Sequence, residues 1–176
     1  MSDIEKAAIE AGFDTVAPLD PRTLKFLPEV RAMCAADRCQ SFNKTWSCPP
    51  ACGELEYWEE KASHYSKGLL LQTIGDREDS YDIEAMMEAA EVNRNEVDAL
   101  AKALMADGMD FLLMAAGTCT RCTKCTYPDS PCRFPDLVFP SMEACGLFVS
   151  QVCTDNNVKY NYGDEKIAYT CCVLYN

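Results

Sequence analysis

Three cysteines stand two residues apart in the run CTRCTKCTYPDSPCRFP, and a fourth lies near its end. They are Cys119, Cys122, Cys125 and Cys132. Thiolates at this spacing can hold three corners of a cubic iron–sulfur cluster, and bacterial cluster-binding runs read C-x2-C-x2-C-x3-C-P. The last gap here is six residues instead of three. Because zinc ribbons usually offer two separated CxxC pairs, the tight triplet favours a [4Fe-4S] cluster, with zinc or reactive thiols as alternatives.

A second group of cysteines stands earlier in the chain with the spacing C-x4-C-x8-C-P-P-x-C. Its members are Cys34, Cys39, Cys48 and Cys52. A proline after a ligand stiffens the chain and lowers the entropy cost of holding the thiolate in place. We expect a metal centre here too, iron–sulfur before zinc, with buried free cysteines as the alternative. In two-cluster ferredoxins the fourth cysteine serves the other cluster, so Cys48 and Cys132 could exchange sites.

The remaining chemical groups carry weaker signals. Glu143 is a candidate catalytic carboxylate, although a carboxylate in the first turn of a helix more often serves the helix dipole. Arg121 and its basic neighbours could offset the charge of a four-thiolate cluster, or could be plain surface charges. Four further cysteines are best explained by core packing, with a third metal site or a redox pair as weaker alternatives: Cys145, Cys153, Cys171 and Cys172.

The composition limits the classes of function. The 176 residues carry 12 cysteines and a net charge of −12, which argues against binding a nucleic-acid backbone and suits a basic docking patch on a redox partner protein. The first residues, MSDIEKAAIEAGFD, lack the apolar run of a signal peptide, and no stretch approaches the length of a membrane span. We therefore expect a cytoplasmic protein with no membrane partner, where thiols stay reduced and many cysteines indicate metal.

The elements that must position these cysteines predict an α+β (mixed α/β) fold. We expect a single cysteine-rich metal-binding domain over residues 1–176, with a sheet of three to four strands and helices packed on it. Its cluster loops span residues 30–53 and 117–135. A strand at 67–74, a helix from Asp79 or Ser80 to about Asp107 and a strand at 110–116 form a βαβ unit that leads into Cys119.

Other segments complete this expected layout. Residues 54–66 predict a helix, residues 18–31 an extended or looped stretch, and residues 141–152 a helix capped by Ser141. Residues 159–162 and 166–174 could pair as a terminal hairpin. The long helix should bury one stripe of apolar side chains: Ile83, Met86, Met87, Ala90, Val97, Leu100, Ala101 and Leu104.

The motifs together resemble a family of small prokaryotic proteins, common in anaerobes, that is described as a predicted metal-binding domain of unknown function. The likeness covers about residues 30–150 and rests on WSCPP at 46–50, AAGTCTRCTKC at 115–125, SPCRFP at 130–135 and PSMEACG at 140–146. It implies metal-binding cysteines and an anaerobic setting, but no particular reaction. Cys52 and the Cys171–Cys172 pair depart from the family's usual pattern, which leaves the ligand set open.

Three functions are compatible with these features. The first is an iron–sulfur protein with two [4Fe-4S] clusters that transfers electrons in anaerobic metabolism. The second is an enzyme that binds substrate at an open iron, for which the irregular position of Cys132 marks the candidate site. The third is a zinc-stabilised structural or interaction module. No glycine-rich nucleotide-binding motif accompanies the cysteines.

Overall fold

One four-stranded sheet forms the centre of the molecule in a computed structural model that describes residues 2–176. The strand order is β1-β2-β4-β3, and each neighbouring pair is antiparallel. The long central pair, β2 and β4, runs in register over ten residues, from Lys67 opposite Tyr175 to Asp76 opposite Lys166. The strands are β1 (Thr15–Leu19), β2 (Lys67–Asp76), β3 (Phe111–Met114) and β4 (Lys166–Tyr175).

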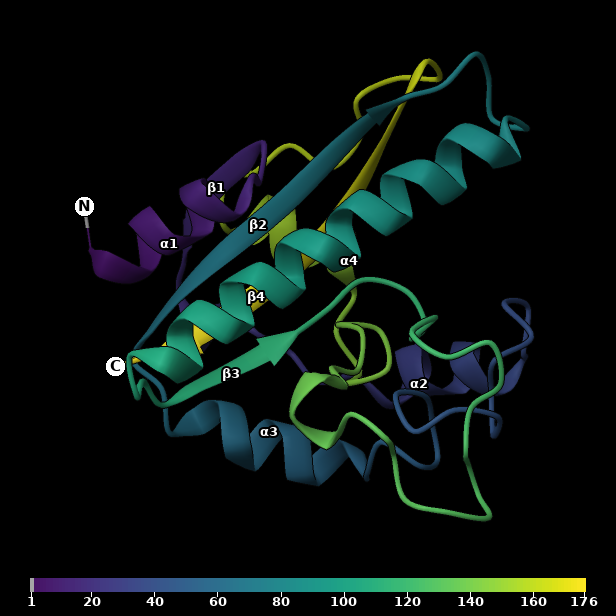
Figure 1. Cartoon of the computed structure of the whole chain (residues 1–176). Helices are drawn as coiled ribbons and strands as arrows, with labels where there is room; N and C mark the ends of the chain where they lie inside the picture. Colours follow the sequence, from purple (N-terminus) through teal and green to yellow (C-terminus); the bar gives the residue numbers. More distant parts are fainter. Residues whose placement is uncertain (1) are drawn as a thin grey trace.

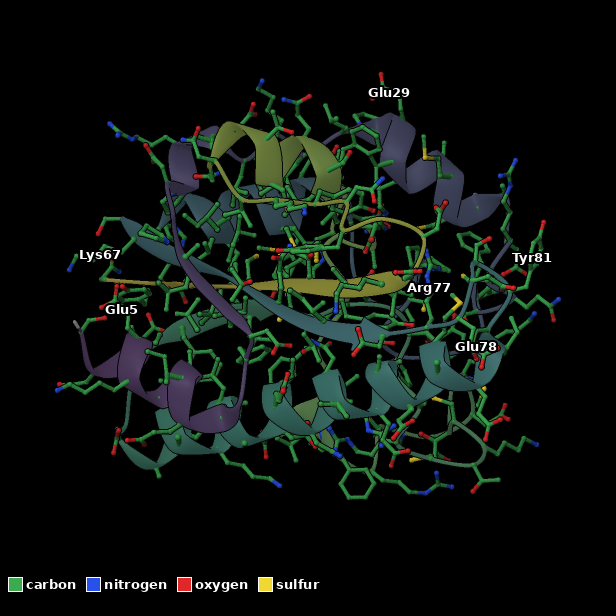
Figure 2. The ribbon with its side chains drawn as sticks, turned by 90° about the horizontal axis from the view of Figure 1, so that it is seen from above. Glu5, Glu29, Lys67, Arg77, Glu78 and Tyr81 are labelled. Atoms are coloured by element: carbon green, nitrogen blue, oxygen red, sulfur yellow. The ribbon has the colours of Figure 1, made fainter. Side chains whose placement is uncertain are left out.

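Helices cover both faces of this sheet. Figure 2 shows the sheet from its edge, between the labels Lys67 and Arg77, with α1 and α4 on one side and α2 and α5 on the other. The described residues also contain two short 3₁₀ turns, Pro21–Thr23 and Pro135–Leu137. The result confirms the predicted α+β class. The helices are α1 (Asp3–Ala11), α2 (Pro28–Ala35), α3 (Leu55–Ser63), α4 (Ile83–Ala106) and α5 (Val149–Asp155).

Each face of the sheet has its own hydrophobic core, because alternate residues of a strand point to opposite sides. On one face Leu70 and Cys172 pack with Trp58 of α3 and Val152 of α5. On the other face the cluster is built from side chains of α1, α4 and the strands: Ile4, Ala8, Leu69, Leu71, Val97, Leu100, Leu104, Cys171 and Val173.

The predicted βαβ unit exists in a split form. Both β2 and β3 are antiparallel to β4, so they run parallel to each other, but β4 lies between them. The connecting helix α4 is capped by Asp82, whose carboxylate accepts a hydrogen bond from the amide of Ala85 at 3.1 Å. The predicted buried stripe of α4 is confirmed from Val97 onward. The first turns differ, since Ile83 and Met87 are exposed where α4 extends past the sheet.

Two predicted elements are wrong. Residues 141–152 do not form one helix, because Gly146 adopts a φ of +97° and a Cβ there would lie 2.2 Å from a side-chain carbon of Leu55. The segment instead makes a turn followed by α5. Residues 159–162 do not pair with β4, whose neighbours are β2 and β3. The buried side chain of Gln72 holds this segment through the carbonyl of Lys159 and the hydroxyl of Tyr162.

The stretch at 18–31 is more ordered than its prolines predict. Pro18 lies in β1, an edge strand, where the missing amide hydrogen is tolerated, and Pro28 is the first residue of α2, a position proline favours. Within residues 2–176, none of the helices combines the length and the apolar character that crossing a bilayer requires.

Candidate metal centres

The first cysteine loop opens onto a cavity of about 260 Å³. Cys34 lies in the last turn of α2, and Cys39 and Cys48 follow in the loop before α3. These three cysteines line the cavity together with Ser141 and Glu143 from the turn before α5. Burial raises the pKa of the Cys34 thiol, and repulsion from Cys39 and Cys48 acts in the same direction. The cavity has room for several atoms, because one water in the liquid takes about 30 Å³.

Cys52 stands apart from the other three and does not line this cavity. Its sulfur lies 3.8 Å from the carbonyl oxygen of Ala144 and 3.8 Å from a guanidinium nitrogen of Arg31. Burial raises the pKa of Cys52 to about 11, against the opposing effect of the Arg31 charge. Arg31 also donates to the carbonyls of Ala144 at 2.6 Å and Gly53 at 2.8 Å. It therefore ties α2 to both segments that surround Cys52.

The second cysteine loop leaves β3 and encloses a much smaller cavity, about 20 Å³. This volume is smaller than the share of about 30 Å³ that one water takes in the liquid. Its walls include Trp46, Arg121 and Arg133 and all four cysteines of the loop: Cys119, Cys122, Cys125 and Cys132. Burial raises the pKa of Cys119, while the nearby Arg121 charge lowers it.

The two loops interlock through backbone and side-chain contacts, and Figure 1 shows both on the same side of the molecule, near α2. The amide of Cys119 donates to the hydroxyl of Ser47 at 3.1 Å. The sulfur of Cys48 lies 3.3 Å from the hydroxyl of Thr118. Each contact thus joins a cysteine of one loop to the residue just before a cysteine of the other.

Trp46 adds a further link between the loops. Its indole nitrogen donates to the carbonyl of Ser130 at 3.2 Å, and its ring meets Tyr127 edge to face with centroids 5.0 Å apart. The cysteines nevertheless remain grouped by loop. Cys48 lines the first cavity and Cys132 the second, so each lies with cysteines of its own loop.

Arg121 is the basic residue that the structure fixes most firmly at the second loop. Its guanidinium donates to both carboxylate oxygens of Asp98 on α4, at 2.6 and 2.5 Å, and to the carbonyl of Leu137 at 3.1 Å. The bond to Asp98 raises the pKa of Arg121. The remaining nitrogen, Nε, is buried and has no hydrogen-bond partner among the described residues. A buried donor without a partner is costly, so this atom is suited to an acceptor at the cysteines.

Glu143 lies on the rim of the first cavity, in a turn instead of the predicted helix. Its backbone carbonyl is 3.9 Å from the sulfur of Cys34. The residue as a whole is solvent-exposed, yet the protein atoms around its carboxyl remove enough water to raise its pKa. Ser141 caps the turn by accepting a hydrogen bond from the amide of Ala144 at 3.1 Å.

The four remaining cysteines are completely buried in the two cores, as core packing predicts: Cys145, Cys153, Cys171 and Cys172. Cys171 and Cys172 point to opposite faces of β4. Burial raises the pKa of Cys153 to about 11 and of Cys171 to about 12.

These pKa directions predict the order of thiol alkylation in metal-free, reduced protein. Cys39 is exposed and should react first with iodoacetamide at pH 8. Cys153 should react at least about 100-fold more slowly, because a thiol with a pKa near 11 is only about one part in a thousand thiolate at that pH and its sulfur is enclosed. Mass spectrometry of quenched time points measures both rates. Equal rates at the two positions would contradict the burial described above.

Sequence reasoning missed Arg31, Ser47 and Thr118. Arg31 lies in an ordinary helical stretch and carries no motif. Ser47 and Thr118 did leave a signal, since each directly precedes a cysteine of a predicted site. Their contacts with cysteines depend on how the two loops pack against each other, because a hydroxyl partner far away in the chain leaves no spacing pattern.

Within residues 2–176, no three His, Cys, Asp or Glu side chains are already arranged as ligands of one metal ion. No curated protein and no solved structure matches the chain. A family model does match, and it covers residues 17–175, which include both cysteine loops and the whole sheet except Thr15 and Val16 of β1. The chain therefore belongs to the family described as "Predicted metal-binding protein (DUF2284)".

Proposed function

We propose that this metal-binding protein holds two [4Fe-4S] clusters, one at each cysteine loop, and transfers single electrons. Cys119, Cys122, Cys125 and Cys132 are the proposed ligands of one cluster. Cys34, Cys39 and Cys48 are proposed ligands of the other, with Cys52 as its fourth candidate. Thiolates are the ligands that iron–sulfur clusters use, and the single histidine of the chain leaves few other soft donors.

The observation that carries this proposal is the position of residues 117–121. Gly117 and Thr118 line the first cavity, and Cys119 and Arg121 line the second. Centres on the two sides of one short segment are close, and short distances favour electron transfer. The net charge of −12 supports a redox partner with a basic docking patch.

The donor chemistry around Cys119 supports a cluster, although the loop must widen beyond its cavity of about 20 Å³ to hold one. The buried Nε of Arg121 lacks a partner, and hydrogen bonds from the protein to cluster sulfurs are a common means of setting the reduction potential. The positive charge of Arg121 acts on both Cys119 and Cys122, since their thiolates in turn raise its pKa. Arg121 is therefore the proposed donor to the second centre.

One observation favours a second candidate, an enzyme whose substrate meets an open iron. Three cysteines line the larger cavity and Cys52 does not, while Ser141 and Glu143 also line it. A cluster iron that no cysteine coordinates would have a free coordination position for substrate. The open position is then expected at the first loop, instead of at Cys132, which lines its cavity together with the other three cysteines of its loop.

Metal analysis of anaerobically purified protein tests the proposal. We expect a brown protein with about eight irons and equal sulfide per chain, and a paramagnetic signal at low temperature after reduction. A colourless, folded protein that contains zinc would instead establish the structural zinc module and refute the clusters. Cys52→Ser separates the two cluster candidates, since an electron carrier with four cysteines at the first site loses iron there and an open-iron enzyme keeps it.

A further inference from the structure

A third cavity, of about 250 Å³, lies beside the second cysteine loop and shares only Cys119 with the two cysteine groups. One wall is the face of α4 that carries Ala90, Asn93, Arg94 and Val97, at the helical spacing of three and four residues. The opposite wall is the segment that leaves β3, which runs beside α4 in Figure 1 and includes Thr118, Cys119 and Thr120. Phe139 and Tyr169 close the cavity.

One cation, Arg94, has no counter-charge among the residues that line this cavity. Asp98 and Arg121 both line the cavity, but they neutralise each other through two hydrogen bonds. Arg94 has no such partner among the lining residues. Its guanidinium donates to the hydroxyl of Thr120 at 2.7 Å and forms only a 3.3 Å ion pair with Glu91, a side chain 66% exposed and outside the cavity. An exposed ion pair of this kind contributes little.

Two further polar side chains of the lining, Asn93 and Tyr169, already form hydrogen bonds within the protein. The amide nitrogen of Asn93 donates to Thr73 at 2.8 Å, and the hydroxyl of Tyr169 donates to the backbone of Met86 at 2.9 Å. Tyr169 therefore presents its ring to the cavity. The rest of the wall is mostly apolar: Ala90, Val97, Ala115, Ala116, Leu137 and Phe139. A ligand must bring one negative charge and an apolar body.

We propose that this cavity binds a small organic monocarboxylate with an apolar body, with its carboxylate on Arg94 and Thr120. Guanidinium and carboxylate form strong, charge-assisted hydrogen bonds, and the apolar walls favour an aliphatic or aromatic remainder. The volume equals roughly eight liquid waters, the size class of a single-ring acid. Cys119 lines both this cavity and the second cysteine site, so a bound acid would lie next to that centre.

Calorimetric titration of the full chain with benzoate tests the binding site. We expect saturable binding with a Kd of about 1 mM or tighter, and no saturation with the neutral isostere benzamide. Arg94→Gln should weaken benzoate binding about 10- to 100-fold, because it removes the charged donors. Ala90→Phe should abolish binding by filling the cavity while the Arg94 guanidinium is still present.

Arg22→Gln is the matched control, because it removes one guanidinium from an exposed pair with Asp20 that lies outside the cavity. It should bind benzoate like the unchanged protein. Absence of benzoate binding, equal binding by Arg94→Gln, or equal binding of benzamide would each overturn the proposal, and inorganic phosphate binding more tightly than benzoate would overturn the ligand class. Iron content is measured on the same samples, so a failure of the cluster proposal is seen separately from a failure of this one.

Discussion

Replacing Cys122 with serine is expected to halve the iron content, from about eight to about four irons per chain. Cys122 lies between Cys119 and Cys125 in sequence and lines the second cavity only. A serine hydroxyl stays protonated at neutral pH and is a far poorer ligand for iron than a thiolate. The first centre keeps its own cysteines, so its irons should remain. Iron and sulfide quantitation after anaerobic purification gives the ratio directly.

Cys153→Ala provides the matched control, because it also removes one thiol but from the core beneath α5. Its iron content should equal that of the unchanged protein, with a modest loss of stability of about 1 kcal/mol from the small cavity. Loss of all iron from Cys122→Ser alone would indicate a single shared centre. Full retention of iron would remove Cys122 from the proposed ligands.

The sequence was most informative where local rules and tertiary packing agree. The helix predicted at 54–66 is α3, and the long helix predicted to end near Asp107 ends at Ala106, with Gly108 at a φ of +67° just beyond it. Both helices have one apolar stripe and a polar remainder, which is the pattern that periodicity detects. The predicted N-terminal cap, Asp79 or Ser80, was wrong, because several acidic and hydroxyl residues precede α4 and Asp82 is the cap.

The wrong elements have in common that distant contacts decide them. Gly146 interrupts the predicted helix because Leu55, far away in the chain, fills the space where a side chain would be. Tyr162 and its neighbours are held by Gln72 instead of by a strand partner. The same reason applies to the candidate sites. The spacing of each cysteine group could be read from the sequence, but the position of Cys52 outside the lining of the first cavity depends on its contacts with Arg31 and Ala144.

Asp98→Asn is expected to lower the free energy of unfolding by about 3 kcal/mol, because it breaks a largely buried ion pair and leaves Arg121 without a counter-charge. The two side chains are only 13% and 17% exposed. For a chain of this length about 3 kcal/mol corresponds to a fall in Tm of roughly 6–12 °C. Thermal unfolding of the protein as isolated, followed by circular dichroism, measures the change.

Glu91→Gln is the control for this prediction, since it also removes one carboxylate from α4, but from an exposed ion pair with Arg94. Its cost should stay below about 1 kcal/mol. A similar small change for both variants would show that the Asp98–Arg121 pair is no stronger than a surface pair.

The Asp98–Arg121 pair also predicts which of the two proposed metal centres should lose iron first. Arg121 joins the second cysteine loop to α4 through Asp98 and to residue 137 through a backbone carbonyl. In Asp98→Asn the guanidinium keeps its charge but loses one of its two acceptors on α4, so the loop between Cys119 and Cys125 should become less well ordered. Iron should then be lost from the second centre before the first, whose cysteines are positioned by α2 and Arg31. Comparing the iron content of Asp98→Asn with that of Cys122→Ser tests this, because both variants should approach the same residual iron, and equal loss from the two centres would contradict it.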